Sequence, residues 1–381
     1  MVKFVHTSDW QLGMRRHFLL PEAQGQFTGD RVNTIRKIGE TARRAEAEFV
    51  VVAGDVFETN WLSQKDIAQA LDAMREIGLP VYLLPGNHDV LNSSSIYDSA
   101  AFKNNQPENV VVLRENHYQV ANDVEILAAP WTSKHPDGDP VSGPLGELFS
   151  TLPADGTVRI VVGHGMLDEL NPDAMALDSI DRSRLDDALD RGVIHYVALG
   201  DRHIRWPTDD SGAIHYSGAH EVTDYKEITK GSDVTVPGAV LIVEVDENNL
   251  DVHHVAVGQW RFMQKAYVLT TQEDVDALDR ELSAVENANR TILKLTLTGV
   301  LSTSQKARLE TILSRHEDRF GALEYWQRHT NLKVLPDEND FADISADGYL
   351  KKTVDELSGR AEDAVASEAL MLLHQIMSEE K

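Results

Sequence analysis

Residues 81–89 read VYLLPGNHD, an apolar run followed closely by a glycine and three polar residues. The apolar and aromatic composition of Val81–Leu84 is typical of a strand. Gly86 permits a sharp turn and leaves room for a ligand beside the backbone. Asn87, His88 and Asp89 therefore stand just beyond the end of a predicted strand, where α/β proteins build their binding sites.

The same arrangement occurs four more times along the chain. Each of these blocks follows a predicted strand: Asp9-Trp10-Gln11, Gly54-Asp55, Gly163-His164 and Gly200-Asp201-Arg202-His203. Strand ends of this kind gather at one edge of a sheet, so we expect the five blocks to meet there. Their carboxylates, imidazoles and amide can together hold two divalent metal ions, with one carboxylate bridging the pair.

Composition narrows the class of protein. The 381 residues include 36 Lys and Arg against 62 Asp and Glu, a formal charge of −26, and no cysteine. Any metal must therefore be held by His, Asp, Glu, Asn or Gln. Apolar runs such as Phe49–Ala53 are far shorter than the roughly twenty residues that cross a bilayer. We expect a cytoplasmic protein with no membrane partner, and the net charge counts against nucleic acid.

The order of predicted elements indicates a layered α/β fold over residues 1–262. Short apolar strands alternate with helical segments such as Arg31–Glu46 and Gln64–Ile77, and strands then follow one another in series. Helices between strands early in the chain and serial strands later are typical of an α/β sandwich.

The remaining chain predicts two further parts. Residues 263–336 alternate strand and helix patterns and predict a small α/β cap domain, closed by a strand at Leu323–Trp326 or Leu332–Leu335. Residues 337–381 are acidic, yet their apolar residues keep a helical period, which predicts a linker and a C-terminal helix at Thr353–Glu379. This helix either docks a partner or packs on its own domain.

The five blocks in this order resemble the calcineurin-like metallophosphoesterases. The stretches VHTSDWQLG, VVAGDVFE, LPGNHD and YVALGDRH are similar to those of SbcD-like nuclease subunits of DNA double-strand-break repair, and Tyr216–Glu221 resembles the segment after their last metal ligand. The resemblance covers about the first 260 residues well and the rest by arrangement only. It implies a β-sandwich flanked by helices, followed by a small α/β cap and a C-terminal helix.

The resemblance also implies how the blocks divide between two metal ions. One ion would be surrounded by Asp9, Asp55 and His203, and the second by Asp55, Asn87 and His164. Asp55 would therefore bridge the two ions. His88 would contact the scissile phosphate or protonate the leaving oxygen, and Asp89 would orient His88 or the turn that carries it.

This chain departs from the SbcD-like pattern at two positions. That family usually carries His where Gln11 and Asp201 stand, so each metal loses one imidazole and gains a candidate oxygen ligand. Asp201 is a good ligand for a hard cation. Gln11 is neutral and therefore a weaker ligand, and it could instead hold a metal-bound water. We expect Mn²⁺, with Mg²⁺ as the second choice, rather than Zn²⁺. The changes could also weaken one site and reduce the activity.

The resemblance implies a DNA nuclease that hydrolyses phosphodiester bonds with two metals, as an exonuclease or also an endonuclease. It further implies an SbcC-like SMC-type ATPase as partner and a homodimer formed through the catalytic domains. Two alternatives stay open. One is a phosphodiesterase for a small phosphodiester, which the net charge favours, and the other is a scaffold subunit whose catalysis is weakened by the two lost histidines.

Other polar residues have simpler interpretations. We expect His6 to form hydrogen bonds within the core, and His253 and His254 to be a surface or core pair away from the blocks. Arg15-Arg16-His17 closely follows the block Asp9-Trp10-Gln11, and this run either contacts the DNA backbone or forms a solvated loop.

Overall fold

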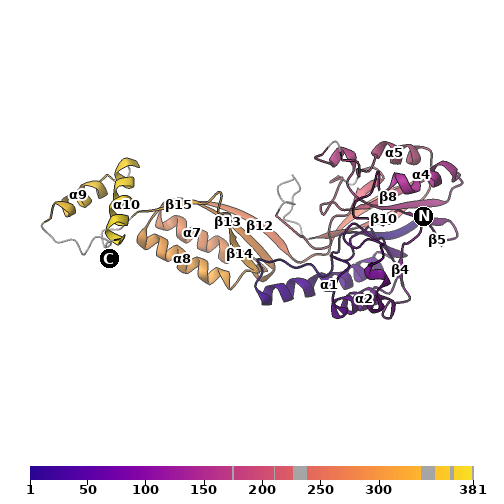
Figure 1. Cartoon of the computed structure of the whole chain (residues 1–381), viewed down its shortest axis with the longest axis horizontal. Coiled ribbons are helices and arrows are strands. Elements are labelled where there is room, and N and C mark those ends of the chain that lie inside the picture. The colour runs from indigo at the N-terminus through magenta and orange to yellow at the C-terminus, as the bar shows by residue number, and fades with distance from the viewer. Residues whose placement is uncertain (174–175, 210, 226–237, 336–347, 361–363, 380–381) are drawn as a thin grey trace. The chain divides into compact units, whose positions relative to one another are not determined.

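The structure is a computed structural model of the whole chain, and it describes residues 1–173, 176–209, 211–225, 238–335, 348–360 and 364–379. The chain divides into two compact units, Met1–Arg261 and Phe262–Lys381 (Figure 1). The expected acidic linker over residues 337–347 lies outside the described residues. Among the helices that are described, none is long and apolar enough to cross a membrane.

The first unit is built on two sheets. In spatial order, the six strands of one sheet are β11 (Leu250–Ala256), β10 (Ala239–Val245), β1 (Val2–Thr7), β2 (Phe49–Val52), β3 (Val81–Leu83) and β4 (Val110–Val112). The five strands of the other are β5 (His117–Ala121), β6 (Val124–Ala128), β7 (Val158–His164), β8 (Tyr196–Gly200) and β9 (Ile214–Tyr216). Strands β1 to β4 pair in parallel, and so do β6 to β9.

The two sheets pack face to face because their strands alternate between two apolar faces. In β1, Phe4 belongs to the core between the sheets, whereas the next residue, Val5, faces the helical side. Phe49 and Val51 of β2 follow the same alternation and meet Ile160 of β7 in the core between the sheets. Strand β2 is buried along its whole length, as expected for a parallel strand covered on both faces.

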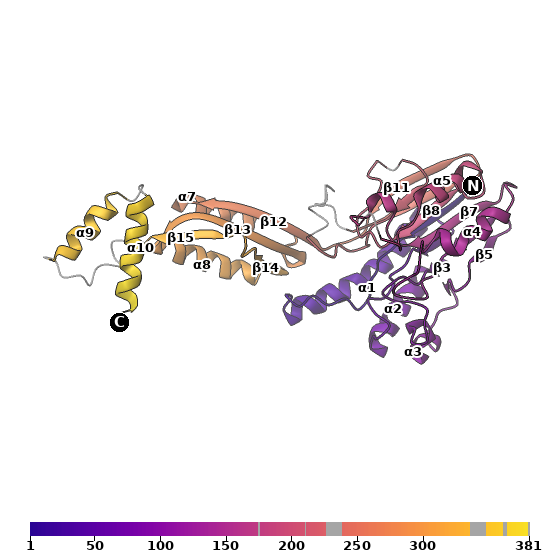
Figure 2. The same ribbon diagram turned by 45° about the horizontal axis from the view of Figure 1, so that its top comes forward.

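Helices cover the outer face of each sheet (Figures 1 and 2). Their bounds are α1 (Pro21–Arg44), α2 (Gln64–Ile77) and α3 (Ala100–Lys103) on one side, and α4 (Ser142–Thr151) and α5 (Arg182–Asp190) on the other. Helix α2 is fixed at both ends by its sequence, since Ser63 accepts a hydrogen bond from the Asp66 amide and Gly78 ends the helix in the left-handed conformation. The result is the helix-flanked β-sandwich that the sequence predicts.

Some elements of this unit differ from the sequence prediction. Helix α1 begins at Pro21, ten residues before the predicted start at Arg31, because its first ten residues bury only Phe27 and Asp30 and carry no apolar period. Strand β5 and helices α4 and α5 were not predicted. Strand β5 is a partly exposed edge strand, and the polar helix α5 buries only Leu185 and Ala188.

The second unit contains a smaller sheet and two helices that pack on it. The strands are β12 (Arg261–Leu269), β13 (Thr291–Ser302), β14 (Ala322–Tyr325) and β15 (Asn331–Leu335), and the helices are α7 (Gln272–Ser283) and α8 (Thr303–Glu317). Both candidates for the closing strand are present, because the long β13 pairs in parallel with β14 along its first half and with β15 along its second. Apolar residues of α7, α8 and β13 form one core.

The predicted single helix at Thr353–Glu379 is two helices. Helix α9 spans Tyr349–Ser358 and ends at Gly359, and α10 spans Ala364–Glu379. Glycine is a poor helix former, and the apolar period continues past it, so the sequence pattern alone does not show the interruption. Val354 of α9 and Leu370 of α10 pack together.

His6 is buried in the core of the first unit, as the sequence predicts. Its Nδ1 lies 3.0 Å from the Tyr196 hydroxyl and its Nε2 lies 3.2 Å from the Leu199 carbonyl oxygen. Burial lowers the pKa of His6 from 6.5 to about 3, and the nearby His215 adds to the effect. His253, in contrast, is exposed and pairs with Asp251.

We predict that His6 makes the fold sensitive to acid. Below pH 6.5 the unfolded chain protonates His6 while the folded chain does not until about pH 3, so stability falls as the pH falls through this range. Between about pH 7.5 and about pH 5 this loss should be about 2 kcal/mol. Urea unfolding in EDTA at both pH values should show a smaller loss for His6→Gln, whereas His253→Gln should behave as wild type. An equal loss in the His6 variant would contradict the prediction.

Candidate metal centre

The five blocks come together at the carboxyl ends of the parallel strands. Asp9 follows β1, Asp55 follows β2, and the Asn87 turn follows β3 in one sheet. His164 ends β7 and Asp201 directly follows β8 in the other sheet. The site is therefore made by both sheets, which face each other across the core.

Backbone hydrogen bonds tie the loops of the site to one another. The Asp9 amide donates to the Gly54 carbonyl at 3.1 Å, and the Gln11 amide donates to the Asp55 carbonyl at 2.8 Å. The Asp201 amide donates to the Asp9 carboxylate, 3.1 Å from Oδ1. These bonds hold the loops that carry Asp9, Asp55 and Asp201 together.

The backbone of the site is strained. Among the described residues, the non-glycine residues with φ in the left-handed region are Asp9, Gln11, Glu46, Asp55, Asp201 and Asn287. Four of these six belong to the predicted ligand set. Such conformations carry a cost in free energy and persist where the surrounding structure imposes them, which is common at functional sites.

Two glycines allow the side chains to approach so closely. Gly54 has φ +90°, and a Cβ there would lie 2.0 Å from Nδ1 of His164. A Cβ on Gly86 would lie 2.2 Å from Oδ1 of Asp55. Close packing against the site therefore requires glycine at both positions, and the left-handed backbone requires it at Gly54 as well.

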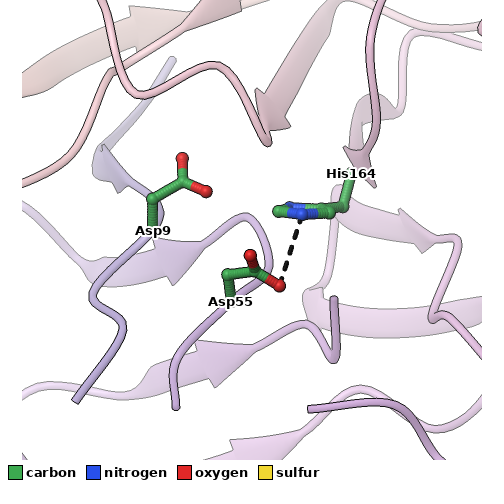
Figure 3. A group of neighbouring side chains, drawn as sticks. All are labelled: Asp9, Asp55 and His164. Atoms are coloured by element: carbon green, nitrogen blue, oxygen red, sulfur yellow. Dashed lines mark ion pairs between the residues drawn. The ribbon is translucent and has the colours of Figure 1, made fainter. Parts of the chain in front are cut away.

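Three ionisable side chains form the centre of the site (Figure 3). Asp9, Asp55 and His164 are buried, and one candidate ligand atom from each lies within 4.8 Å of the other two. Nε2 of His164 lies 3.4 Å from Oδ1 of Asp55. Nδ1 of His164 lies 2.9 Å from the carbonyl oxygen of Ala53, so Nδ1 carries the proton of the neutral ring and Nε2 is the nitrogen that faces the carboxylates.

Buried atoms without hydrogen-bond partners indicate what the site can bind. Oε1 of Gln11, Oδ1 of Asn87 and Nε2 of His164 are buried and have no hydrogen-bond partner among the described residues. Buried polar atoms nearly always have partners, and these three are all lone-pair donors. Together with two buried carboxylates they fit divalent cations, which such oxygen and nitrogen ligands bind.

The remaining ligand candidates fall into two groups. Nε2 of His203 lies 3.3 Å from Nε2 of Gln11 and 3.8 Å from Oδ1 of Asp9. On the other side, Nε2 of His164 lies 3.8 Å from Oδ1 of Asp201. The side chains of Gln11 and His203 thus lie beside Asp9, and that of Asp201 lies beside His164.

Electrostatics of the three central groups favour a cation. Burial raises the pKa of Asp9, although His203 and His164 oppose the shift. Burial would also raise the pKa of Asp55, but the charge of His164 holds it below its usual value. For His164, burial would lower the pKa, but the surrounding carboxylates outweigh burial and raise it well above its usual value. The cluster therefore favours positive charge, whether as protons or as metal ions.

His88 and Asp89 have different surroundings. The side chain of His88 is 39% exposed, its Nδ1 lies 2.9 Å from the Glu58 carbonyl oxygen, and its Nε2 lies 3.8 Å from Oδ2 of Asp55. Asp89 is buried and accepts hydrogen bonds from the Gly86 amide at 2.7 Å and the Tyr97 hydroxyl at 2.6 Å. Of the two roles expected for Asp89, these contacts support positioning of the turn.

Several residues that the sequence analysis missed hold the ligands in place. Oγ1 of Thr223 lies 2.8 Å from Nδ1 of His203, and Ser8 donates to Asp9 at 2.6 Å. A terminal nitrogen of Arg16 donates to the carbonyl of Thr223. One member of the Arg15-Arg16-His17 run therefore contacts the residue that holds His203. The motifs give no signal for Thr223, because it lies twenty residues beyond His203 in a segment without a motif.

Comparison with known proteins identifies the family. A model of the calcineurin-like phosphoesterases matches residues 2–253, which is most of the first unit. The chain belongs to this family. Over 251 residues the phosphoesterase is 28% identical to the DNA double-strand break repair protein Mre11 of Archaeoglobus fulgidus, a match that covers 60% of this chain and 52% of the relative. The chain thus spans about half the length of that relative.

Solved structures show weaker similarity to the phosphoesterase. The protein TT1561 of Thermus thermophilus has a TM-score of 0.39 at 11% identity and covers 66% of this chain and 98% of its own. A dimetal phosphatase of Danio rerio has a TM-score of 0.40 at 10% identity, and the match covers 66% of this chain and 98% of the phosphatase chain. The family assignment rests on the family model and not on these structures.

We predict that Asp55 is needed for both metal ions. Asp55→Asn removes the negative charge that bridging requires, so Mn²⁺ bound per chain should fall below two ions and hydrolysis should be lost. Elemental analysis of the purified protein measures the metal content, and Asp251→Asn, at an exposed residue of β11, is the matched control. Two ions and normal hydrolysis in Asp55→Asn would show that this carboxylate is not the bridge.

We also predict that the two departures from the SbcD-like pattern set the metal preference. Replacing oxygen ligands by imidazole in the double variant Gln11→His, Asp201→His should tighten Zn²⁺ binding relative to Mn²⁺ by tenfold or more, roughly the effect of one ligand interaction. A competition titration of wild type and variant measures the ratio. An unchanged ratio would indicate that neither side chain reaches a metal ion.

Proposed function

We propose that this chain is a two-metal phosphodiesterase that cleaves DNA. The observation that carries the proposal is the buried cluster of Asp9, Asp55 and His164, extended by the unpartnered atoms of Gln11 and Asn87. Two divalent cations, when bound, would neutralise phosphate oxygens and lower the pKa of a water molecule. We propose Mn²⁺, or Mg²⁺ in its place, because oxygen ligands predominate in both sets.

The chain's own residues supply position and proton transfer. Nδ1 of His88 donates to the Glu58 carbonyl oxygen, so Nε2 is the ring nitrogen left to exchange a proton, and it can donate one when the ring is an imidazolium. In that position the imidazole would donate to a phosphate oxygen or to the leaving oxygen. Asp89 would keep His88 in place through its hydrogen bonds to Gly86 and Tyr97, because these fix the turn on which His88 stands.

Similarity to Mre11 supports DNA as the substrate. The relative is named for DNA double-strand-break repair, and the match covers 60% of this chain. Against DNA stands the formal charge of −26, since DNA binding needs local positive charge. The same charge supports a small phosphodiester as the alternative substrate. A scaffold subunit with weakened catalysis is the second alternative, because Gln11 and Asp201 stand where the SbcD-like pattern has histidines.

One assay separates these three functions. The purified chain is incubated with Mn²⁺ and either linear double-stranded DNA or a chromogenic phosphodiester. Release of nucleotides from DNA ends supports an exonuclease, and cutting of circular DNA adds endonuclease activity. Hydrolysis of the chromogenic substrate alone supports the small-substrate alternative, and no hydrolysis of either would contradict the proposed function and support the scaffold.

The second unit supports a partner proposal. Exposed apolar side chains remain on α9 and α10, among them Tyr349, Val365 and Leu372, and a helix with such a stripe is stable when a partner covers it. We propose that an SMC-type ATPase binds there, in the cytoplasm, and that the catalytic unit forms a homodimer. Deleting residues 348–381 should abolish co-purification with the ATPase while leaving hydrolysis of a small phosphodiester intact. Retention of the ATPase would contradict the docking site.

We predict that His88 acts in chemistry and not in metal binding. His88→Ala should retain Mn²⁺ at the wild-type content but reduce the rate by roughly 10²–10⁴-fold, the range for a positioned acid or base. Metal content and turnover are measured on the same preparation, with His253→Ala as the control. Loss of metal in His88→Ala would instead make His88 a ligand.

A further inference from the structure

Arg31 is a buried arginine of helix α1, and its guanidinium reaches the loop that carries two predicted metal ligands. The residue is only 1% exposed. Its Nη2 donates a hydrogen bond to the carbonyl oxygen of Trp10 at 2.6 Å. Trp10 stands between Asp9 and Gln11, so this bond holds the block Asp9-Trp10-Gln11 at its middle residue. Hydrogen bonds from a charged donor are stronger than those between neutral groups, so the contact resists displacement of the loop.

The other terminal nitrogen of Arg31 contacts the segment that supports His203. Nη1 donates to the carbonyl oxygen of Glu221 at 3.3 Å. Two residues further along the chain, Oγ1 of Thr223 lies 2.8 Å from Nδ1 of His203. Nε2 of the same imidazole lies 3.8 Å from Oδ1 of Asp9. One guanidinium therefore joins the loop that carries Asp9 to the segment that holds the imidazole beside it.

Both contacts of Arg31 belong to a buried polar network. The Glu221 carboxylate accepts hydrogen bonds from the Thr34 hydroxyl at 2.5 Å and from the Trp260 amide at 3.0 Å. Nε2 of His220 lies 3.0 Å from the carbonyl oxygen of Arg31. All of these residues are buried. Because the network fixes α1 against the segment after β9, the guanidinium is held on a rigid base.

A second buried arginine of the same unit has its contacts away from the site. Arg159 is 2% exposed, and its guanidinium pairs with Glu125 at 2.7 Å and with Asp155 at 3.0 Å. Its Nη1 also donates to the carbonyl oxygen of Pro153 at 2.7 Å. Arg159 lies near the amino end of β7, whereas the site lies at the carboxyl ends of the strands. It is therefore a matched control for the loss of a buried arginine.

We propose that Arg31 is a positioning residue for the metal ion that Asp9 and His203 would hold. By fixing the carbonyls of Trp10 and Glu221, it sets the spacing of these two ligands before an ion binds. Residues that orient metal ligands in this way typically contribute 10- to 100-fold to metal affinity, roughly as much as a weak ligand. The inference rests on the proposed two-metal function and gives a role to a helix outside the five blocks.

Mn²⁺ binding tests this assignment without relying on turnover. Mn²⁺ is titrated into the full chain, and electron paramagnetic resonance distinguishes a spin-coupled pair of ions from single ions. Arg31→Met should bind one ion about 10- to 100-fold more weakly than wild type, so the coupled spectrum should appear only at higher Mn²⁺ concentration. Arg31→Lys retains the charge but not the fork that reaches both carbonyls, so its affinity should fall between them. Arg159→Met should be less stable to urea but should match wild type in Mn²⁺ affinity and spectrum.

Equal Mn²⁺ affinity in wild type and Arg31→Met would overturn the assignment. An equal loss of affinity in Arg159→Met would also overturn it, because general destabilisation would then explain both variants. If Arg31→Met does not fold, Arg31→Lys and Arg159→Lys provide the test. Only Arg31→Lys should bind Mn²⁺ more weakly than wild type, and equal affinities in the two would overturn the assignment.

Hydrolysis by wild type separates this inference from the proposed function. A wild type that binds a coupled Mn²⁺ pair, and loses it in Arg31→Met, supports the positioning role whether or not it cleaves DNA or the chromogenic phosphodiester. Absence of hydrolysis in that protein defeats only the proposed function. Normal hydrolysis with unchanged Mn²⁺ affinity in Arg31→Met defeats only the positioning role.

Discussion

The first unit depends on bringing two buried carboxylates and one buried imidazole into contact. Asp9 and Asp55 are almost fully buried, and the charged groups that oppose them are the imidazoles of His164, His203 and His88. Burying carboxylates without a fixed cation costs several kcal/mol per charge, by the general scale of such desolvation. Divalent cations offset that cost, which is why the cluster is best understood as a metal centre.

The rest of the unit can be understood as the means of holding this cluster. Parallel strands from two sheets end at one place, so loops that are distant in sequence meet there. Glycine at Gly54 and Gly86 provides the space, and left-handed backbone at Asp9 and Asp55 turns the carboxylates inward. Ser8 and Thr223 then orient individual ligands through hydrogen bonds. Strain in the loops is sustained by the packed core beneath them.

The sequence predicted the sandwich and the meeting of the blocks because both follow from local patterns. A buried parallel strand such as Phe49–Val52 is continuously apolar, and the polar residues after it necessarily lie at the sheet edge. Strand β5 and helix α5 were missed because partly exposed elements bury few side chains and show little apolar period. Thr223 and Tyr97 were missed because their roles arise only when distant segments pack together. The division of the tail into α9 and α10 was missed because the apolar pattern runs across Gly359.

The central claim is that the cluster binds two metal ions that share Asp55. Crystals grown with Mn²⁺ and measured at the manganese absorption edge test it most directly, since anomalous difference density locates each ion. The account predicts two peaks, one beside Asp9, Gln11 and His203 and the other beside Asn87, His164 and Asp201, with Asp55 between them. A single peak, or peaks remote from Asp55, would contradict it.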